Sequence, residues 1–510
     1  MGQTKDQAIR DIVKGAGFVY SGLVLEMAIA FLAQVLAARY LSASDFGGVT
    51  AGVALLNIGA IVSSVGFGNG LARYFPRHDA ATKSELARAS FLITFPVSVV
   101  ISGLVTLNAE FLAADVFGDP TVTPSILIFG ATIPFAATLR VVVGGIQGQK
   151  NARYRVYVEN LVRPVVRFSL VIVAVVYGLG QAGFAGSYAI PYVLGSVLAV
   201  VLLARTLPEL TETWSVDWDL TRSVLRYSTP FILSATAGFI YRSADIFLLL
   251  YFLDSEAVGI YGVAYAAAKL MLMFSTAFNF MSMPVASELE SGGGIAAAVD
   301  VQRPVLRWIT AASIPVFVPL VLFSPEFISI VYSSRYAGGA VALSILVAGF
   351  AVHNVLSTQS NLLKALGRSK LIAANSAGSA VVNVVLNILL IPRWGIEGAA
   401  VATVISYLIY DALFTLELWY DTGEVILGRD LAEPVALALP LLAAVWYVKP
   451  IVPPSIAAIV VTTALFSTAF LVTLLVVTGI RPEEEMVILS IQERLGVESR
   501  HLNTLLERLS

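Results

Sequence analysis

Two opposite charges lie in the middle of one apolar stretch, TAGFIYRSADIFLLLYFL, which runs from Thr236 to Leu253. Arg242 and Asp245 are three residues apart, and Arg242 lies about ten residues from the outer end of the stretch, or ~15 Å along a helix. A charge at the centre of a bilayer costs from about 3 kcal/mol on insertion scales to far more in simulations. Charged residues at such depth face a bundle interior or a water-filled cavity, and by default they mark a transport path.

Other charges lie within neighbouring apolar segments, and most of them are basic. Lys269 has a depth similar to that of Arg242 and has no acidic residue one turn away on its own helix. Glu159, Arg163 and Arg167 follow at i, i+4 and i+8, so they share one helix face. Arginine can hold a phosphate with two parallel hydrogen bonds, so the basic excess suits an anionic, phosphate-bearing cargo. The candidate substrate-binding residues are Arg140, Arg163, Arg167, Arg242 and Lys269, and the candidates for ion coupling are Asp245 and Glu26.

Structural roles compete with transport for several of these charges. Arg242 and Asp245 can pair across one helical turn, and Glu159 can pair with Arg163 near the inner interface. The Arg140 side chain can extend to the cytoplasmic surface. A separate group of polar residues within the apolar segments is expected to make hydrogen bonds between helices rather than contact a ligand. This group is Asn57, Asn69, His353, Asn354, Asn383 and Asn387.

Sequence patterns of enzymes are weak in this chain. The DWD spelling at Asp217–Asp219 matches a metal-dependent glycosyltransferase motif, but its loop is too short for a nucleotide-sugar domain, and Asp219 is predicted to cap a helix. GFGNG at Gly66–Gly70 lacks the spacing of a phosphate loop, so close helix packing or a hinge explains it more simply. There is no cysteine, and the three histidines lie in separate regions. We expect no enzymatic activity, no cofactor and no metal site.

The composition indicates a polytopic membrane protein. The 510 residues are 57% hydrophobic and 13% charged, with a mean hydropathy of +0.83, whereas soluble domains are about 45–50% apolar and about 25% charged. The apolar residues are grouped in windows of roughly 18–25, the length that spans a hydrocarbon core. The net charge of −2 gives no indication of a nucleic-acid partner.

The apolar windows predict about fourteen transmembrane helices. If the N-terminus is cytoplasmic, the inner segments hold most of the 32 lysines and arginines, and this bias supports a cytoplasmic location for both termini. The outer segments then hold only Arg39, Arg335, Arg393 and Lys449. The expected spans are 15–40, 47–72, 89–112, 124–148, 156–180, 184–206, 226–252, 258–287, 304–324, 339–363, 371–392, 395–419, 431–448 and 455–479.

An internal repeat divides these spans into two lobes. YLSASDFGGVTAG from Tyr40 aligns with FLDSEAVGIYGVA from Phe252 at an offset of 212 residues, which matches Gly47 with Gly259. Because the offset contains an even number of spans, the lobes keep one orientation, as in transporters with parallel repeats and a binding site between lobes near the midplane. The expected domains are an N-lobe (1–223), a C-lobe (224–430), two extra spans (431–480) and a cytoplasmic amphipathic tail (481–510).

Several stretches resemble one transporter family along nearly the whole chain. They are YLSASDFGGVTAG with its echo FLDSEAVGIYGVAYAAAK, GGIQGQKNARYRVYVEN after the fourth span, and RYSTPFILSATAGFIYRSAD opening the seventh. They are similar to the Wzx-type oligosaccharide flippases of the polysaccharide transporter family, in the multidrug/oligosaccharidyl-lipid/polysaccharide exporter superfamily. The resemblance implies translocation of a polyprenyl-(pyro)phosphate-linked glycan from the cytoplasmic to the outer leaflet through a cationic cavity, in the cell membrane.

The sequence leaves partners and a rival function open. The carrier lipid can be undecaprenyl or dolichyl, the coupling ion H⁺ or Na⁺, and glycan-assembly proteins are potential partners beside the membrane lipids. A cation-coupled multidrug exporter of the same superfamily is the alternative, but it would need an acidic cavity, and this membrane interior is net basic. A membrane-embedded glycan polymerase would need a large outer loop, which the expected spans do not leave.

Overall fold

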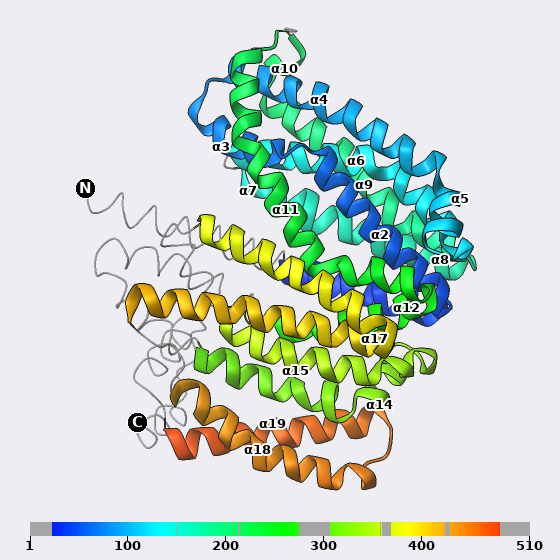
Figure 1. The fold of residues 1–510 in the computed structure, drawn as a ribbon, viewed down its shortest axis with the longest axis vertical. Coiled ribbons are helices and arrows are strands. Elements are labelled where there is room, and N and C mark those ends of the chain that lie inside the picture. The colour runs from blue at the N-terminus through cyan, green and yellow to red at the C-terminus, as the bar shows by residue number, and fades with distance from the viewer. Residues whose placement is uncertain are drawn as a thin grey trace, which may run out of the picture. The chain divides into compact units, whose positions relative to one another are not determined.

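The computed structural model describes residues 23–149, 151–212, 215–273, 275, 306–357, 359, 369–423 and 429–479 (Figure 1). The described residues form helices joined by short turns, and no β-strand occurs among them. The predicted amphipathic tail, the whole segment before the first predicted span and the start of that span lie outside the described residues.

Ten described helices are long and apolar enough to cross a membrane. The bent pair Leu306–Leu322 and Ser324–Val331, with 84° between its halves, can add an eleventh. The ten are Leu23–Tyr40, α2 (Ala43–Ser63), α4 (Ala80–Leu107), α6 (Thr123–Gly148), α9 (Gln181–Thr206), α11 (Trp218–Phe252), α15 (Ala340–Leu356), α17 (Ser369–Thr422), α18 (Arg429–Val448) and α19 (Ile456–Thr478). The chain is therefore an all-α polytopic membrane protein, and the count of fourteen stays a prediction.

The difference in count arises where helices are broken or joined. The two predicted spans 371–392 and 395–419 lie within α17, which is interrupted at Gly395, where φ is 56°. The fifth predicted span is a π-helix, η4 (Val156–Val162), continued by α8 (Arg163–Val176). The eighth begins with α12 (Ser255–Ala268) and a short 3₁₀ turn, η5 (Lys269–Met271).

The chain divides into two compact units. The first comprises Met1–Ala266, Val331–Ala342 and Ser376–Ser406, and the second comprises Ala267–Ile330, Leu343–Asn375 and Tyr407–Ser510. These units do not follow the predicted lobe boundaries, because α11, the start of α12 and the middle of α17 belong with the N-terminal helices. The lobes 1–223 and 224–430 therefore stay a prediction from the repeat.

Glycines bring a short helix of the first unit close to α6. A left-handed residue, Gly66 with φ 73°, separates α2 from α3 (Phe67–Tyr74). A Cβ on Gly144 would lie 2.5 Å from the Cα of Gly68, and one on Gly148 would lie 2.6 Å from the carbonyl oxygen of Leu71. Only glycine allows this approach, so of the two explanations for GFGNG close helix packing is confirmed, and a hinge stays a prediction.

Polar contacts fix the beginning of α12 in the first unit. The Asp119 carboxylate accepts a hydrogen bond from the Ser255 amide at 2.8 Å, and the Ser255 hydroxyl lies 2.5 Å from that of Ser44 on α2. Arg335 donates to the carbonyl oxygen of Leu41 at 2.5 Å. In the predicted topology this end of the helices faces the outside of the cell.

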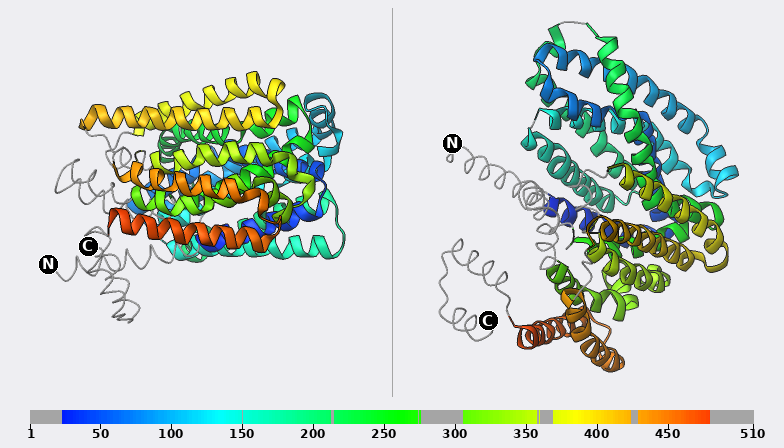
Figure 2. Two further views of the ribbon diagram at one scale, coloured as in Figure 1. Left: turned by 90° about the horizontal axis from the view of Figure 1, so that it is seen from below. Right: turned by 60° about the vertical axis from the view of Figure 1, so that its left-hand side comes forward.

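The second unit includes the paired helices α18 and α19, which lie side by side in both views of Figure 2. Their contact is apolar, with Phe466 and Phe470 buried among residues that include Ala438. Asn354 on α15 donates to the Ser313 hydroxyl at 2.6 Å and accepts from the Ser275 amide at 3.1 Å. For Asn354 the expected hydrogen bonding between helices is confirmed.

Two other expectations about polar residues are wrong. The Asn57 amide donates to Val53 of its own helix at 2.9 Å, and Asn387 donates to Asn383 one turn earlier on α17 at 3.0 Å. An amide side chain four residues from a helical carbonyl finds a local acceptor without a second helix. Asp219 does not cap α11, because the Asp217 carboxylate takes that place and accepts from the Leu220 amide at 2.9 Å.

Candidate functional site

A cavity of about 210 Å³ lies within the first unit, between the end of α2, α3, the second half of α6, η4 and α11. Its apolar lining includes Ile61, Val143, Phe231, Ile232 and Ala235. Its polar lining is Ser64, Asn69, Arg140, Gln147 and Glu159. A cavity whose lining combines several polar and charged groups with apolar side chains suits an amphiphilic ligand.

Arg140 contributes the basic charge of the cavity wall. The side chain lies on α6 and is exposed, and Tyr192, Glu159, Arg163 and Arg242 are all near enough to act on it electrostatically. Three guanidinium groups therefore lie near one another with one carboxylate among them. An anion with several oxygens would balance this charge.

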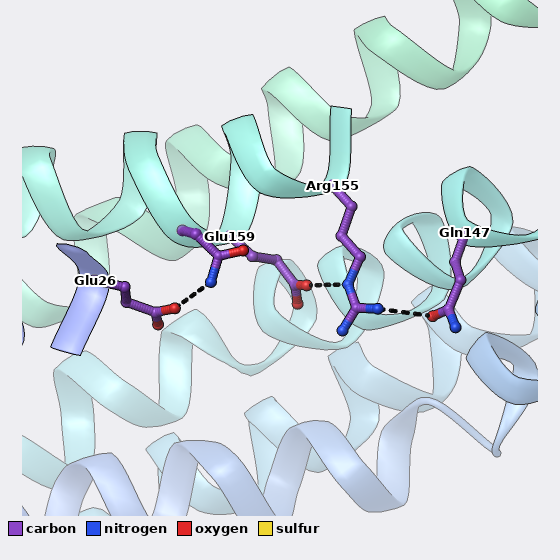
Figure 3. A network of polar contacts seen from close by, with 5 residues as sticks. Glu26, Gln147, Arg155 and Glu159 are labelled. Carbon is purple, nitrogen blue, oxygen red and sulfur yellow. Dashed lines mark hydrogen bonds and ion pairs between the residues drawn. The ribbon is translucent and has the colours of Figure 1, made fainter. Parts of the chain in front are cut away.

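Glu159 is already engaged by a different arginine from the one expected. Arg155 donates to the Glu159 carboxylate at 2.9 Å and to Gln147 at 3.4 Å (Figure 3). The predicted structural pair between Glu159 and Arg163 is therefore replaced by one with Arg155. Both pairs have the same i, i+4 spacing, so the spacing alone does not decide between them.

Arg163 and Arg167 stack on tyrosines of the neighbouring helix. The Arg163 guanidinium carbon lies 4.3 Å from the centre of the Tyr192 ring, and that of Arg167 lies 5.3 Å from the Tyr188 ring. The pairs run in opposite order along the chain, as antiparallel α8 and α9 require. In both arginines the buried Nε atom has no hydrogen-bond partner. Two oriented cations thus keep donor capacity unused.

Glu26 faces the same helix from the first span. The Asn160 amide donates to its carboxylate, a contact marked by the dashed line from Glu26 in Figure 3. Arg163 and Arg167 are near enough to interact with Glu26 electrostatically. Glu26 is half-buried. The structure therefore brings Glu26, Arg140, Arg163 and Arg167 into one charged region of the first unit, and Arg242 lies near Arg140.

Arg242 and Asp245 have different environments on α11. Arg242 is exposed, whereas Asp245 is only 3% exposed. Asp245 accepts a hydrogen bond from the Tyr261 hydroxyl at 2.6 Å, and Thr403 of α17 lies 3.5 Å away. The interpretation of these two charges as a simple pair across one turn gives no account of the Tyr261 and Thr403 contacts.

Lys269 belongs to the second unit and is not part of the charged region of the first unit. Its side chain is exposed at the start of η5, directly after α12. The structure thus brings together four of the five predicted basic residues in one unit.

Sequence reasoning missed or discounted four residues of this region: Asn69, Gln147, Tyr188 and Tyr192. Asn69 was expected to bond between helices, but it lines the cavity. The tyrosine pair did carry a signal in the sequence. Tyrosines four residues apart on one span, next to arginines four residues apart on the preceding span, can stack as two matched pairs.

Comparisons with known proteins agree with a membrane transporter of glycan synthesis. A family model described as polysaccharide biosynthesis protein matches residues 35–341, which is more than half of the chain. The probable low-salt glycan biosynthesis flippase Agl15 of Haloferax volcanii is 25% identical over 409 residues, covering 79% of this chain and 82% of that protein. The probable flippase AglR of the same organism is 25% identical over 355 residues, covering 68% of this chain and 71% of its own.

A solved structure shares the fold. The lipid II flippase MurJ in an inward closed conformation has a TM-score of 0.71 at 14% sequence identity, with 89% of this chain and 97% of that chain covered. The helices, the charged cavity and these likenesses lead to one conclusion: the chain belongs to the polysaccharide biosynthesis protein family of polytopic membrane proteins.

Proposed function

We propose that this protein is a flippase that moves a polyprenyl-(pyro)phosphate-linked oligosaccharide from the cytoplasmic to the outer leaflet of the cell membrane by alternating access. The observation that carries the proposal is the charge of the cavity region. Arg140, Arg163 and Arg242 act on one another there, while the nearby Glu159 is held by Arg155. The names of the relatives Agl15 and AglR, and the fold shared with MurJ, support the same function.

The residues of the cavity region suggest how the head group is held. Arg140 in the wall would bind the phosphate, and Arg163 and Arg167, stacked on Tyr192 and Tyr188, would add positive charge beside it. The apolar lining from α11 would contact the first part of the lipid. Arg242 on α11 would extend the basic path in the first unit, and Lys269 of the second unit is a further candidate for binding the phosphate, with both termini in the cytoplasm.

Asp245 suits a coupling cation rather than the phosphate. Its buried carboxylate lies with the hydroxyl groups of Tyr261 and Thr403, a set of oxygen ligands that H⁺ or Na⁺ can use. Glu26, beside Arg163 and Arg167, would moderate their charge or share in coupling. No chemical conversion of the substrate is proposed, so the chain would act as a transporter and not as an enzyme.

The decisive experiment deletes the gene and identifies the lipid-linked glycan that accumulates in the inner leaflet. Complementation with Arg242→Ala or Lys269→Ala should restore membrane insertion but not full transport, and Arg393→Ala, an exposed basic residue at the end of a predicted span, serves as control. Unchanged glycans combined with altered drug tolerance would favour the multidrug exporter. Full activity of the Arg242→Ala/Lys269→Ala double variant would refute their role.

A further inference from the structure

A second buried pair of titratable groups lies in the second unit, apart from the charged cavity. His353 on α15 and Asp411 on α17 are joined by a contact of 2.8 Å between the His353 Nδ1 atom and the Asp411 Oδ2 atom. The Asp411 side chain is completely buried, and the His353 side chain is 13% exposed. Neither residue is explained by binding of a lipid-linked phosphate.

The second oxygen of Asp411 is unsatisfied. Its Oδ1 atom is buried and has no hydrogen-bond partner. An ionised carboxylate accepts several hydrogen bonds, and leaving one of its oxygens without a partner in a buried place is costly. A proton bound by the pair is the smallest ligand that reduces this cost, because it cancels the net negative charge of the pair.

In the part of the chain that the structure describes, the surroundings of the pair show no other charge that balances it. The Tyr407 ring packs edge-on against the His353 imidazole with centroids 4.4 Å apart, and Phe350 packs against Tyr407. Among the described residues, His353 is the charged group that acts on Asp411. Glu417, further along α17, accepts a hydrogen bond from Asn375 at 2.8 Å and so has its own partner.

We propose that His353 and Asp411 form a proton-binding site that takes up and releases one proton during the transport cycle. With a neutral imidazole and an ionised carboxylate the pair carries one negative charge, and one added proton makes it neutral overall. Because Asp411 is sealed and His353 is partly exposed, the proton enters through the imidazole. The inference rests on the proposed transport function and names a site for the proton that is separate from Asp245.

The position of the pair gives the proton a mechanical effect. The contact joins α15 to the second half of α17 within one unit. A protonated imidazole and an ionised carboxylate attract each other strongly in a medium of low polarity. Loss of the proton weakens this attraction, so the two helices are held together in one protonation state and released in the other.

Proton binding can be measured without transport because the chain has only three histidines. A His78→Gln/His501→Gln background labelled with ¹⁵N-histidine leaves His353 as the only signal, which is titrated in detergent between about pH 5 and 9. We expect Asp411→Asn to change the pH dependence of the His353 signal, because the neighbouring carboxylate is lost. Glu326→Gln, which removes a half-buried partner of Lys449 in the same unit, should leave the titration unchanged.

A transport assay provides the second test of the proton site. In proteoliposomes, an imposed pH gradient should accelerate flipping of a fluorescent polyprenyl-phosphate glycan by the unmodified chain but not by His353→Gln or Asp411→Asn. An identical His353 titration with and without Asp411, or equal acceleration of flipping in all variants, would overturn the proposal. If Asp411→Asn is not recovered folded, the carboxylic-acid infrared band of Asp411 in His353→Gln, followed with pH, replaces the titration, and a band that does not change would also overturn it.

The two proposals fail in different ways. If no variant and not even the unmodified chain moves a lipid-linked glycan, the flippase function is refuted, whereas the titration of His353 still reports on the proton site. If flipping occurs but neither depends on the pH gradient nor changes with Asp411, the flippase function stands and the proton site is refuted.

Discussion

Gly47 and Gly259 make a reciprocal contact between α2 and α12. A Cβ on Gly47 would lie 2.8 Å from the Gly259 amide nitrogen, and a Cβ on Gly259 would lie 3.1 Å from that of Gly47. Each would also strike a carbonyl oxygen, of Ser255 and of Ala43 respectively. The offset of 212 residues carries Gly47 onto Gly259 and Ala43 onto Ser255, so either half of the contact maps onto the other. Such self-matching contacts are made by elements related by a two-fold axis.

Enlarging either glycine should disrupt this contact. We expect Gly47→Ala and Gly259→Ala each to destabilise the protein by about 1–3 kcal/mol, because the atoms that they would strike are backbone and cannot rotate away. The effect should appear as a lower midpoint of thermal unfolding in detergent.

Gly103→Ala is the matched control for the glycine variants. Gly103 also lies within a membrane helix, but a Cβ there would meet nothing within 4 Å. Alanine should therefore stabilise α4 by about 0.5–1 kcal/mol. Equal unfolding midpoints for Gly47→Ala and Gly103→Ala would show that the α2–α12 contact is not tight.

A disulfide across the same contact should stop transport. The chain contains no cysteine, so Ser44→Cys/Ser255→Cys introduces a single pair where the hydroxyl oxygens are 2.5 Å apart. Alternating access requires the outer ends of α2 and α12 to separate. Oxidation should then abolish flipping, and reduction should restore it.

Each single cysteine variant should be insensitive to the oxidant, which separates cross-linking from damage. Formation of the bond is checked by a gel shift after labelling of free thiols. Undiminished flipping with the bond fully formed would mean that the outer ends need not separate, and alternating access in this form would be abandoned.

Acid should loosen the outer contact through Asp119, which precedes the first residue of its span. Burial raises the pKa of Asp119, but hydrogen bonds from Ser255 and Thr121 outweigh burial and hold this pKa below the ordinary 3.8. The stabilisation is thus fully present above pH 3.8 and is lost as the pH falls through the lowered pKa. Loss of hydrogen bonds to a charged group costs about 1.5–3 kcal/mol.

The comparison of Asp119→Asn with the unmodified chain measures this contribution. Near neutral pH the variant should unfold at a lower temperature, and the two midpoints should converge below about pH 4. Asp254→Asn, at the residue directly before α12, is the control for the loss of one negative charge at the same end of the helix. A difference between the midpoints that persists at the most acid pH would rule out the Asp119 carboxylate as its cause.

The sequence predicted the helical fold well, because apolar windows and repeat spacing depend on local pattern alone. The sequence could not predict which side chains pair with Glu159 and Asp245, because residues on other helices decide this. Arg155 and Arg163 are both four residues from Glu159, and the choice between them follows from Tyr192 on α9, which stacks on Arg163. Similarly, spacing allows Arg242 and Asp245 to pair, but Tyr261 from α12 holds the carboxylate.

The burial of individual polar side chains could not be predicted from the sequence pattern either. The expected hydrogen bonding between helices is confirmed for His353, but nothing near it in the sequence indicates that its partner is Asp411, 58 residues later. The depth of a residue along a span can be counted from residue numbers. Which side of the helix is buried depends on the neighbouring helices that cover it. This is why depth identified the charged region around Arg140 and missed the buried pair.

The stacked arginines give a test that separates charge from shape. Arg163→Lys keeps the positive charge, but an ammonium group cannot lie flat on the Tyr192 ring or offer a planar set of donors. We expect it to reduce the apparent affinity for the lipid-linked glycan roughly five- to thirtyfold, equivalent to about 1–2 kcal/mol for a cation on an aromatic ring away from water. Tyr192→Phe keeps the ring and should transport nearly normally, whereas Tyr192→Leu should resemble Arg163→Lys. The measurement is the concentration dependence of flipping in proteoliposomes. Wild-type affinity in both Arg163→Lys and Tyr192→Leu would mean that the guanidinium plane has no part in holding the phosphate, and that Arg163 contributes through its charge alone.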